Sequence, residues 1–149
     1  MKPSSILELD ASLSKQMRVA EKPGALRAIA AFFAHSGDSW FWAIGLFALW
    51  VSGDTFWKEW AVVQLGSISL LAAMVLLIKL RIKRKRPEGE WGRIYRLSDP
   101  HSFPSGHAAR AFLIATIAAG LGPPGLALAL WIWAPSVALA RVAMGVHYL

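Results

Sequence analysis

The stretch from Trp60 to Leu80 constrains the fold of this chain more than any other feature. Its interior is apolar except for Gln64, Ser67 and Ser69, and Lys79 stands close to its end. About 20 apolar residues in succession are enough to cross the hydrocarbon core of a membrane as a helix. A helix also satisfies every backbone N–H and C=O group within the one segment, where water is absent. The stretch therefore predicts a transmembrane helix that turns Gln64 and Ser67 toward other helices rather than toward lipid.

The composition indicates a membrane partner rather than a nucleic acid. The chain has 149 residues, which suits one domain, and 56% of them are hydrophobic. Its net charge of +7 is compatible with nucleic acid or with anionic lipid. The sequence shows no motif that reads DNA or RNA, and its basic residues border apolar stretches, so lipid is the predicted partner. The absence of cysteine excludes disulfides and thiolate metal sites.

The apolar segments together predict an all-α integral membrane bundle, a single domain over residues 1–149. Residues 1–35 are expected to form interfacial amphipathic helices, broken at Pro23, and a solvated N-terminal tail is the alternative. Asp38 or Ser39 is expected to cap the helix that follows. Membrane helices are predicted over residues 37–52, 60–80, 106–121 and 125–141.

This topology brings three polar clusters to one face of the membrane. Because successive spans alternate in direction, the end of the second membrane helix, the start of the third and the end of the fourth lie on the same side. Those ends carry Lys79 and Arg86, then Ser105, Gly106 and His107, then Arg141 and His147. Cations held so close need an anion, arginine forks match phosphoryl oxygens, and a helix N-terminus attracts negative charge. The clusters therefore predict a phosphoryl-binding site at the membrane surface.

Each cluster by itself has another interpretation. The basic run from Lys79 to Arg86 is also typical of an orientation signal or an anchor for lipid headgroups. His147 could be a structural histidine of the bundle, and Arg141 could complement the dipole of its own helix. Arg110 could face the same site or the lipid headgroups, and His101 is interpreted as a loop residue without a role. It is the convergence of the three clusters that favours a functional site.

The three clusters resemble the motifs of the type-2 phosphatidic acid phosphatase superfamily, which comprises membrane lipid-phosphate phosphatases and soluble vanadium haloperoxidases. Six residues separate Lys79 from Arg86 and Pro87, residues 104–107 read Pro-Ser-Gly-His, and five residues separate Arg141 from His147. Two departures stand out. Ala140 occupies a position that is usually Ser, and the Asp that usually follows the second histidine by four residues would fall beyond Leu149.

The resemblance implies an integral membrane phosphatase that hydrolyses lipid phosphate esters through a phosphohistidine. His147 would be the nucleophile, His107 the general acid and base, and Arg141 a further catalytic residue. Lys79, Arg86, Ser105, Gly106 and Arg141 would bind the phosphate. No metal and no cofactor are expected, because side-chain cations supply the compensating charge. Phosphatidic acid, phosphatidylglycerol phosphate and polyprenyl phosphate or diphosphate all remain possible substrates.

Some alternatives stay open at this point. A membrane protein that binds anions or lipid phosphates without turnover would need the same cluster. A vanadate-dependent haloperoxidase is disfavoured, since those relatives are soluble. The expected location is a bacterial inner membrane, where the positive-inside rule favours a cytoplasmic site although many relatives act on the outer face. We also expect the natural protein to continue beyond Leu149 with an Asp and another span. Oligomeric state does not follow from the residues.

Overall fold

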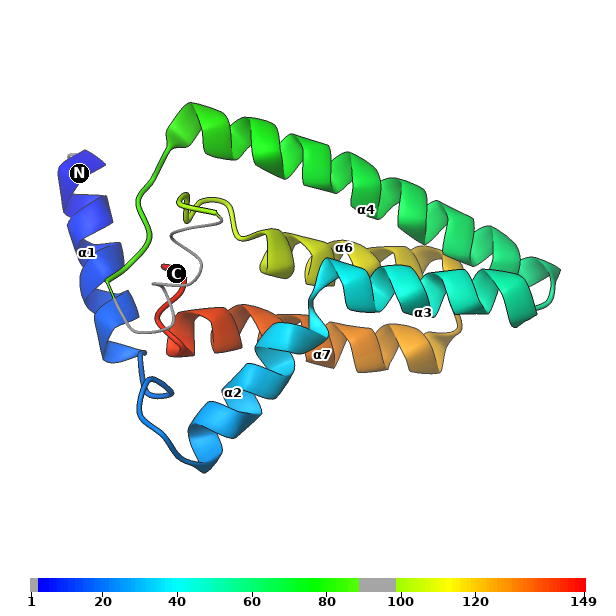
Figure 1. The fold of residues 1–149 in the computed structure, drawn as a ribbon, viewed down its shortest axis with the longest axis horizontal. Coiled ribbons are helices and arrows are strands. Elements are labelled where there is room, and N and C mark those ends of the chain that lie inside the picture. The colour runs from blue at the N-terminus through cyan, green and yellow to red at the C-terminus, as the bar shows by residue number, and fades with distance from the viewer. Residues whose placement is uncertain (1–2, 89–98) are drawn as a thin grey trace.

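The fold of the described chain is helical throughout. The computed structural model describes residues 3–88 and 99–149, with side chains from residue 7 onward, and these ranges contain no strand beyond an isolated bridge between Lys85 and His101. The helices are α1 (Pro3–Gln16), α2 (Ala25–Ser36), α3 (Ser39–Ser52), α4 (Thr55–Ile82), α6 (Gly106–Leu121) and α7 (Pro124–Ala143). The predicted all-α membrane bundle is confirmed (Figure 1).

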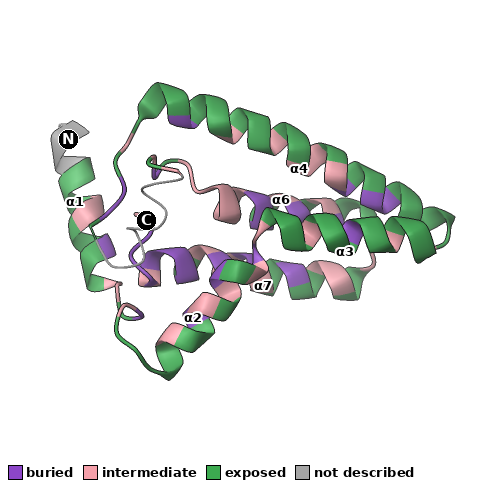
Figure 2. Ribbon diagram, viewed as in Figure 1, coloured by how far each residue is buried: buried purple, intermediate pink, exposed green. Residues whose placement is uncertain are grey.

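Helix α4 is the longest described element, and most of its residues are exposed. It begins at Thr55, five residues before the predicted start, because the carboxylate of Asp54 accepts a hydrogen bond from the backbone N–H of Trp57 (3.1 Å). It ends where Lys83 adopts a left-handed conformation. Leu70 and Leu77 are about two-thirds exposed, and Figure 2 shows most of the α4 ribbon in the colour of exposed residues. Such a surface is unfavourable in water and suits lipid, and both α4 and α7 are long and apolar enough to cross a membrane.

Helices α6 and α7 form the tightly packed centre of the bundle. Ala111, Ala115 and Ala118 repeat along one face of α6 and are completely buried. Their small side chains let the α7 backbone approach closely, which is the usual basis of helix packing in membranes. Residues of α3 and α4 complete this core, and α7 continues through Pro135. The predicted inward orientation of Gln64 agrees with the structure, where its amide donates to the carbonyl of Ile114 (3.4 Å).

A second, smaller core fixes the end of the chain. It joins α2 to the residues that follow α7 and consists of Ala20, Ala30, Ala34, Ala140, Met144 and Val146. Helix α1 adds two contacts at the same end of the molecule. The guanidinium of Arg84 pairs with Asp10 (2.6 Å), and the hydroxyl of Ser14 accepts from the backbone N–H of Leu149 (3.0 Å). The small core and the contact with Ser14 hold the last residues of the chain near the end of α7 (Figure 1).

Candidate active site

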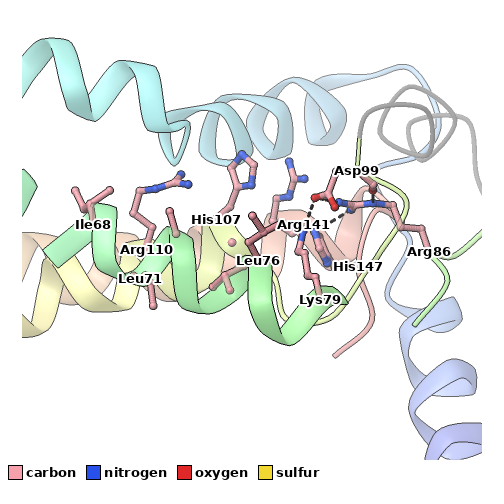
Figure 3. Close-up of a pocket in the computed structure, with 13 residues that line it drawn as sticks. Ile68, Leu71, Leu76, Lys79, Arg86, Asp99, His107, Arg110, Arg141 and His147 are labelled. Carbon is pink, nitrogen blue, oxygen red and sulfur yellow. Dashed lines mark hydrogen bonds and ion pairs between the residues drawn. The ribbon is translucent and has the colours of Figure 1, made fainter. Parts of the chain in front are cut away.

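A cavity of about 470 Å³ opens between α4, α6 and α7 at the end of the bundle where the three predicted clusters meet. Figure 3 shows its side chains following one another from apolar Ile68 and Leu71 to charged Arg86 and Asp99. One wall is an apolar face of α4, and the far end is polar. The lining consists of Ile68, Leu71, Ala72, Val75, Leu76, Lys79, Arg86, Asp99, Gly106, His107, Arg110, Arg141 and His147. The cavity thus has the shape and polarity of a site for an amphipathic anion.

The N-terminus of α6 is set by its cap. The hydroxyl of Ser105 accepts from the backbone N–H of Ala108, which starts the helix at Gly106 and places His107 in its first turn. Gly106 and His107 both line the cavity, whereas Ser105 lines a neighbouring cavity of about 240 Å³. Of the residues predicted to bind phosphate, Ser105 is therefore the one that the structure leaves outside the main cavity, and its hydroxyl serves the helix.

A tight turn after α7 brings His147 back beside Arg141. The carbonyl of Arg141 accepts from the backbone N–H groups of Val146 (3.1 Å) and His147 (3.2 Å). Gly145 makes this turn at φ +67°, a left-handed conformation that favours glycine, and a Cβ there would collide with the Glu21 carboxylate. The five-residue spacing of the third motif is therefore the length of one closed turn, which aims both side chains into the cavity.

The ring of His147 is held at both nitrogens. Its Nδ1 lies 2.6 Å from the carbonyl oxygen of Ser102, and its Nε2 lies 3.0 Å from Nη1 of Arg86. A carbonyl can only accept, so Nδ1 carries the proton, and a guanidinium can only donate, so Nε2 presents its lone pair. The Ser102 carbonyl thus orients the imidazole.

His147 is neutral at physiological pH. Burial lowers its pKa, and the positive charges of Arg141 and Arg86 lower it further, so that the pKa falls to about 2 despite the hydrogen bond to Ser102. The side chain is almost fully buried, with 3% of the residue exposed. The ring of His147 therefore adds no positive charge to the cations around it.

Asp99 is a member of the site that the sequence did not reveal. Its carboxylate pairs with Lys79 and with Nη2 of Arg86 (2.7 Å), and its backbone carbonyl accepts from Nε of Arg86 (2.6 Å). Burial alone would raise the pKa of Asp99, but the hydrogen bond and charge of Lys79, with the charge of Arg86, outweigh it and hold that pKa below its ordinary value. Asp99 is a loop residue before a proline, so its sequence context indicated only a turn.

Asp38 is a second acidic residue whose contact with the site could not be predicted from the sequence. It occupies the N-cap position of α3 as expected, but its side chain makes no capping hydrogen bond. One carboxylate oxygen instead lies 2.7 Å from Nε2 of His107. Arg110, one turn along α6 from His107, lines the cavity and donates to the carbonyl of Gly37. Residues before α3 therefore reach the same site as α4, α6 and α7.

The described lining of the cavity is strongly cationic. Lys79, Arg86, Arg110 and Arg141 are balanced there by the single carboxylate of Asp99. Within the residues that the structure describes, no three His, Asp or Glu side chains gather closely enough to hold a metal ion. The side-chain cations of the lining lie beside the neutral ring of His147. Apolar helices with this site at one end are suited to a membrane protein that acts on or binds amphipathic phosphates.

Comparison with known proteins identifies the family. Residues 60–149 match the model of the PAP2 superfamily, and the chain belongs to that superfamily, which confirms the resemblance seen in its motifs. A solved structure with a similar fold is described as the first transmembrane PAP2 type phosphatidylglycerolphosphate phosphatase from Bacillus subtilis. The two chains share 22% sequence identity and superpose with a TM-score of 0.71, over 99% of this chain and 77% of the other.

Proposed function

We propose that this protein hydrolyses phosphate monoesters of membrane lipids through a phosphohistidine, without a metal. The observation that carries the proposal is the cavity, which joins an apolar wall on α4 to a cationic end with two histidines. A lipid phosphate has the same division between tail and head. The Bacillus subtilis protein of similar fold is named for phosphatidylglycerolphosphate, which makes that lipid the first substrate to test.

The chemistry divides between the two histidines. Nε2 of His147 attacks phosphorus while the ester P–O bond breaks, and His107 gives its proton to the departing alkoxide. A water molecule then attacks the phosphohistidine, gives its proton to His107, and releases phosphate as the P–N bond breaks. Lys79, Arg86 and Arg141, together with the N–H of Gly106, are proposed to hold the equatorial oxygens during both steps.

The experiment is a phosphate-release assay in detergent micelles. The lipids are phosphatidylglycerol phosphate, phosphatidic acid, and polyprenyl phosphate and diphosphate, with glycerol 3-phosphate as a substrate that lacks a tail. We expect release from at least one lipid, slower release from glycerol 3-phosphate, little change on adding EDTA, and inhibition by vanadate. Loss of activity in EDTA that a divalent ion restores would contradict the mechanism. Binding of lipid phosphate without release would support the alternative, a binding protein without turnover.

We infer that the site faces the cytoplasm of a bacterial cell and that the protein lies in the inner membrane. By the predicted topology, every Lys and Arg except Lys58 is on the active-site side, and positive charge favours the cytoplasm. The 149 residues contain no cysteine, so a single cysteine introduced into this chain shows on which side of the membrane its position lies. We expect an impermeant thiol reagent to label Lys58→Cys in intact cells and to leave Lys83→Cys unlabelled until the cells are opened.

Both reporter positions are exposed and sit at opposite ends of α4, so each serves as the control for the other. Rapid labelling of Lys83→Cys in intact cells, with protection of Lys58→Cys, would place the site on the outer face instead.

A further inference from the structure

We propose that Asp38 is the positioning residue for His107, which it keeps in the tautomer and orientation needed to protonate the leaving group. The inference rests on the proposed function, because it concerns the acid of that reaction. It adds to the three sequence motifs a fourth element, the short link between α2 and α3.

The first step of the argument is the hydrogen bond between Asp38 and His107. Oδ1 of Asp38 lies 2.7 Å from Nε2 of His107, a distance typical of a charge-assisted hydrogen bond. A carboxylate accepts, so Nε2 carries a proton. The second carboxylate oxygen lies 3.2 Å from Nδ1 of His35, a half-exposed residue at the end of α2. Asp38 therefore connects the first turn of α6 to the link between α2 and α3.

The second step is the consequence for the other nitrogen of His107. Among the described residues, Nδ1 has no hydrogen-bond partner, and the ring lines the cavity. With Nε2–H engaged by Asp38, Nδ1 is the nitrogen that exchanges a proton with substrate. It gives its proton to the alkoxide in the first half-reaction and takes one from water in the second. Asp38 stabilises the imidazolium form, which exists before the first event and again after the second, without taking a proton itself.

The third step is that the link is held rigidly. The carbonyl of Ser36 accepts from the indole N–H of Trp42 (2.9 Å), and the hydroxyl of Ser36 accepts from that of Trp133 (2.8 Å). Arg110 donates to the carbonyl of Gly37. A Cβ on Gly37 would lie only 3.0 Å from the side chain of Val137, so glycine allows the link to lie flat on α7. Groups on α3, α6 and α7 thus fix the position of the Asp38 carboxylate.

The fourth step is that the Asp38 carboxylate does not cap its own helix. Asp at an N-cap usually accepts from a backbone N–H of the first turn, yet Asp38 makes no such bond on α3. Asp54, the N-cap of α4, does make it. The contrast between two N-cap aspartates of one chain indicates that Asp38 is directed to His107 by the tertiary structure.

The test compares two leaving groups. A lipid alkoxide must be protonated as it departs, whereas 4-nitrophenolate leaves without a proton. We expect Asp38→Asn to lower kcat about 100-fold on the lipid phosphate that the wild type hydrolyses best, and less than about 5-fold on 4-nitrophenyl phosphate. Asp54→Asn is the matched control, since it changes an N-cap carboxylate at the opposite end of the bundle. It should leave the ratio of the two rates unchanged, as should His35→Gln.

The ratio of the two rates, taken on one sample, does not depend on how much of the protein is folded, so a poorly folding variant still decides the question. An equal loss on both substrates, or no loss on either, overturns the role of Asp38 while leaving the proposed function intact. Absence of phosphate release by the wild type from any lipid would instead overturn the proposed function.

Discussion

Replacement of His147 by alanine is expected to abolish phosphate release from lipid, with a loss on the order of 10⁴-fold or more in kcat. The reason is that, in the proposed mechanism, Nε2 of His147 forms the covalent bond to phosphorus, and the contacts at both ring nitrogens hold it in position for this step. The measurement is steady-state phosphate release, supported by trapping of labelled phosphate on the protein after acid-free quenching, because phosphohistidine is lost in acid.

His101→Ala is the matched control for this variant. His101 lies in the loop before α6, bridges to Lys85 through the backbone, and does not line the cavity, so its loss should change kcat by less than about 2-fold. His107→Ala should slow turnover of lipid by about 10²-fold or more while His147 can still be labelled. Retention of a tenth of the wild-type activity by His147→Ala would contradict the phosphohistidine mechanism.

The second large effect is expected at Arg86. Its guanidinium donates at once to the carboxylate and the carbonyl of Asp99, to the carbonyl of Val146 (2.9 Å) and to Nε2 of His147. Lysine keeps the charge but has no planar fork, so it cannot replace several directed bonds. We expect Arg86→Lys to lower kcat/KM on the order of 10²-fold and to weaken inhibition by vanadate.

Arg81→Lys provides the control for Arg86→Lys. Arg81 stands five residues earlier on α4, is exposed, and does not line the cavity. The same substitution there should leave both kcat/KM and vanadate inhibition within about 2-fold of the wild type. Unchanged vanadate inhibition in Arg86→Lys would show that this arginine stabilises the turn at His147 without binding the phosphoryl group.

The apolar helices could be predicted from sequence because the length of an apolar run is a local property. The predicted bounds 106–121 coincide with those of α6, and the start of α3 differs by two residues. The start of α4 differs by five, since a run of apolar residues marks where hydrocarbon begins rather than where the helix does. The start of the helix is set by the cap at Asp54, and Asp54 lies outside the apolar run.

The sequence by itself determined the family, the helical membrane class and the meeting of three motifs, because each motif sits at the end of a helix whose direction the topology fixes. Only the tertiary structure decided what surrounds the two histidines. Asp38 and His107 are 69 residues apart, and Ser102 and His147 are 45 apart. The Ser102 contact is made by a backbone carbonyl, which every residue type possesses, so no side-chain pattern could indicate it. Helix packing alone brings these groups within hydrogen-bond distance.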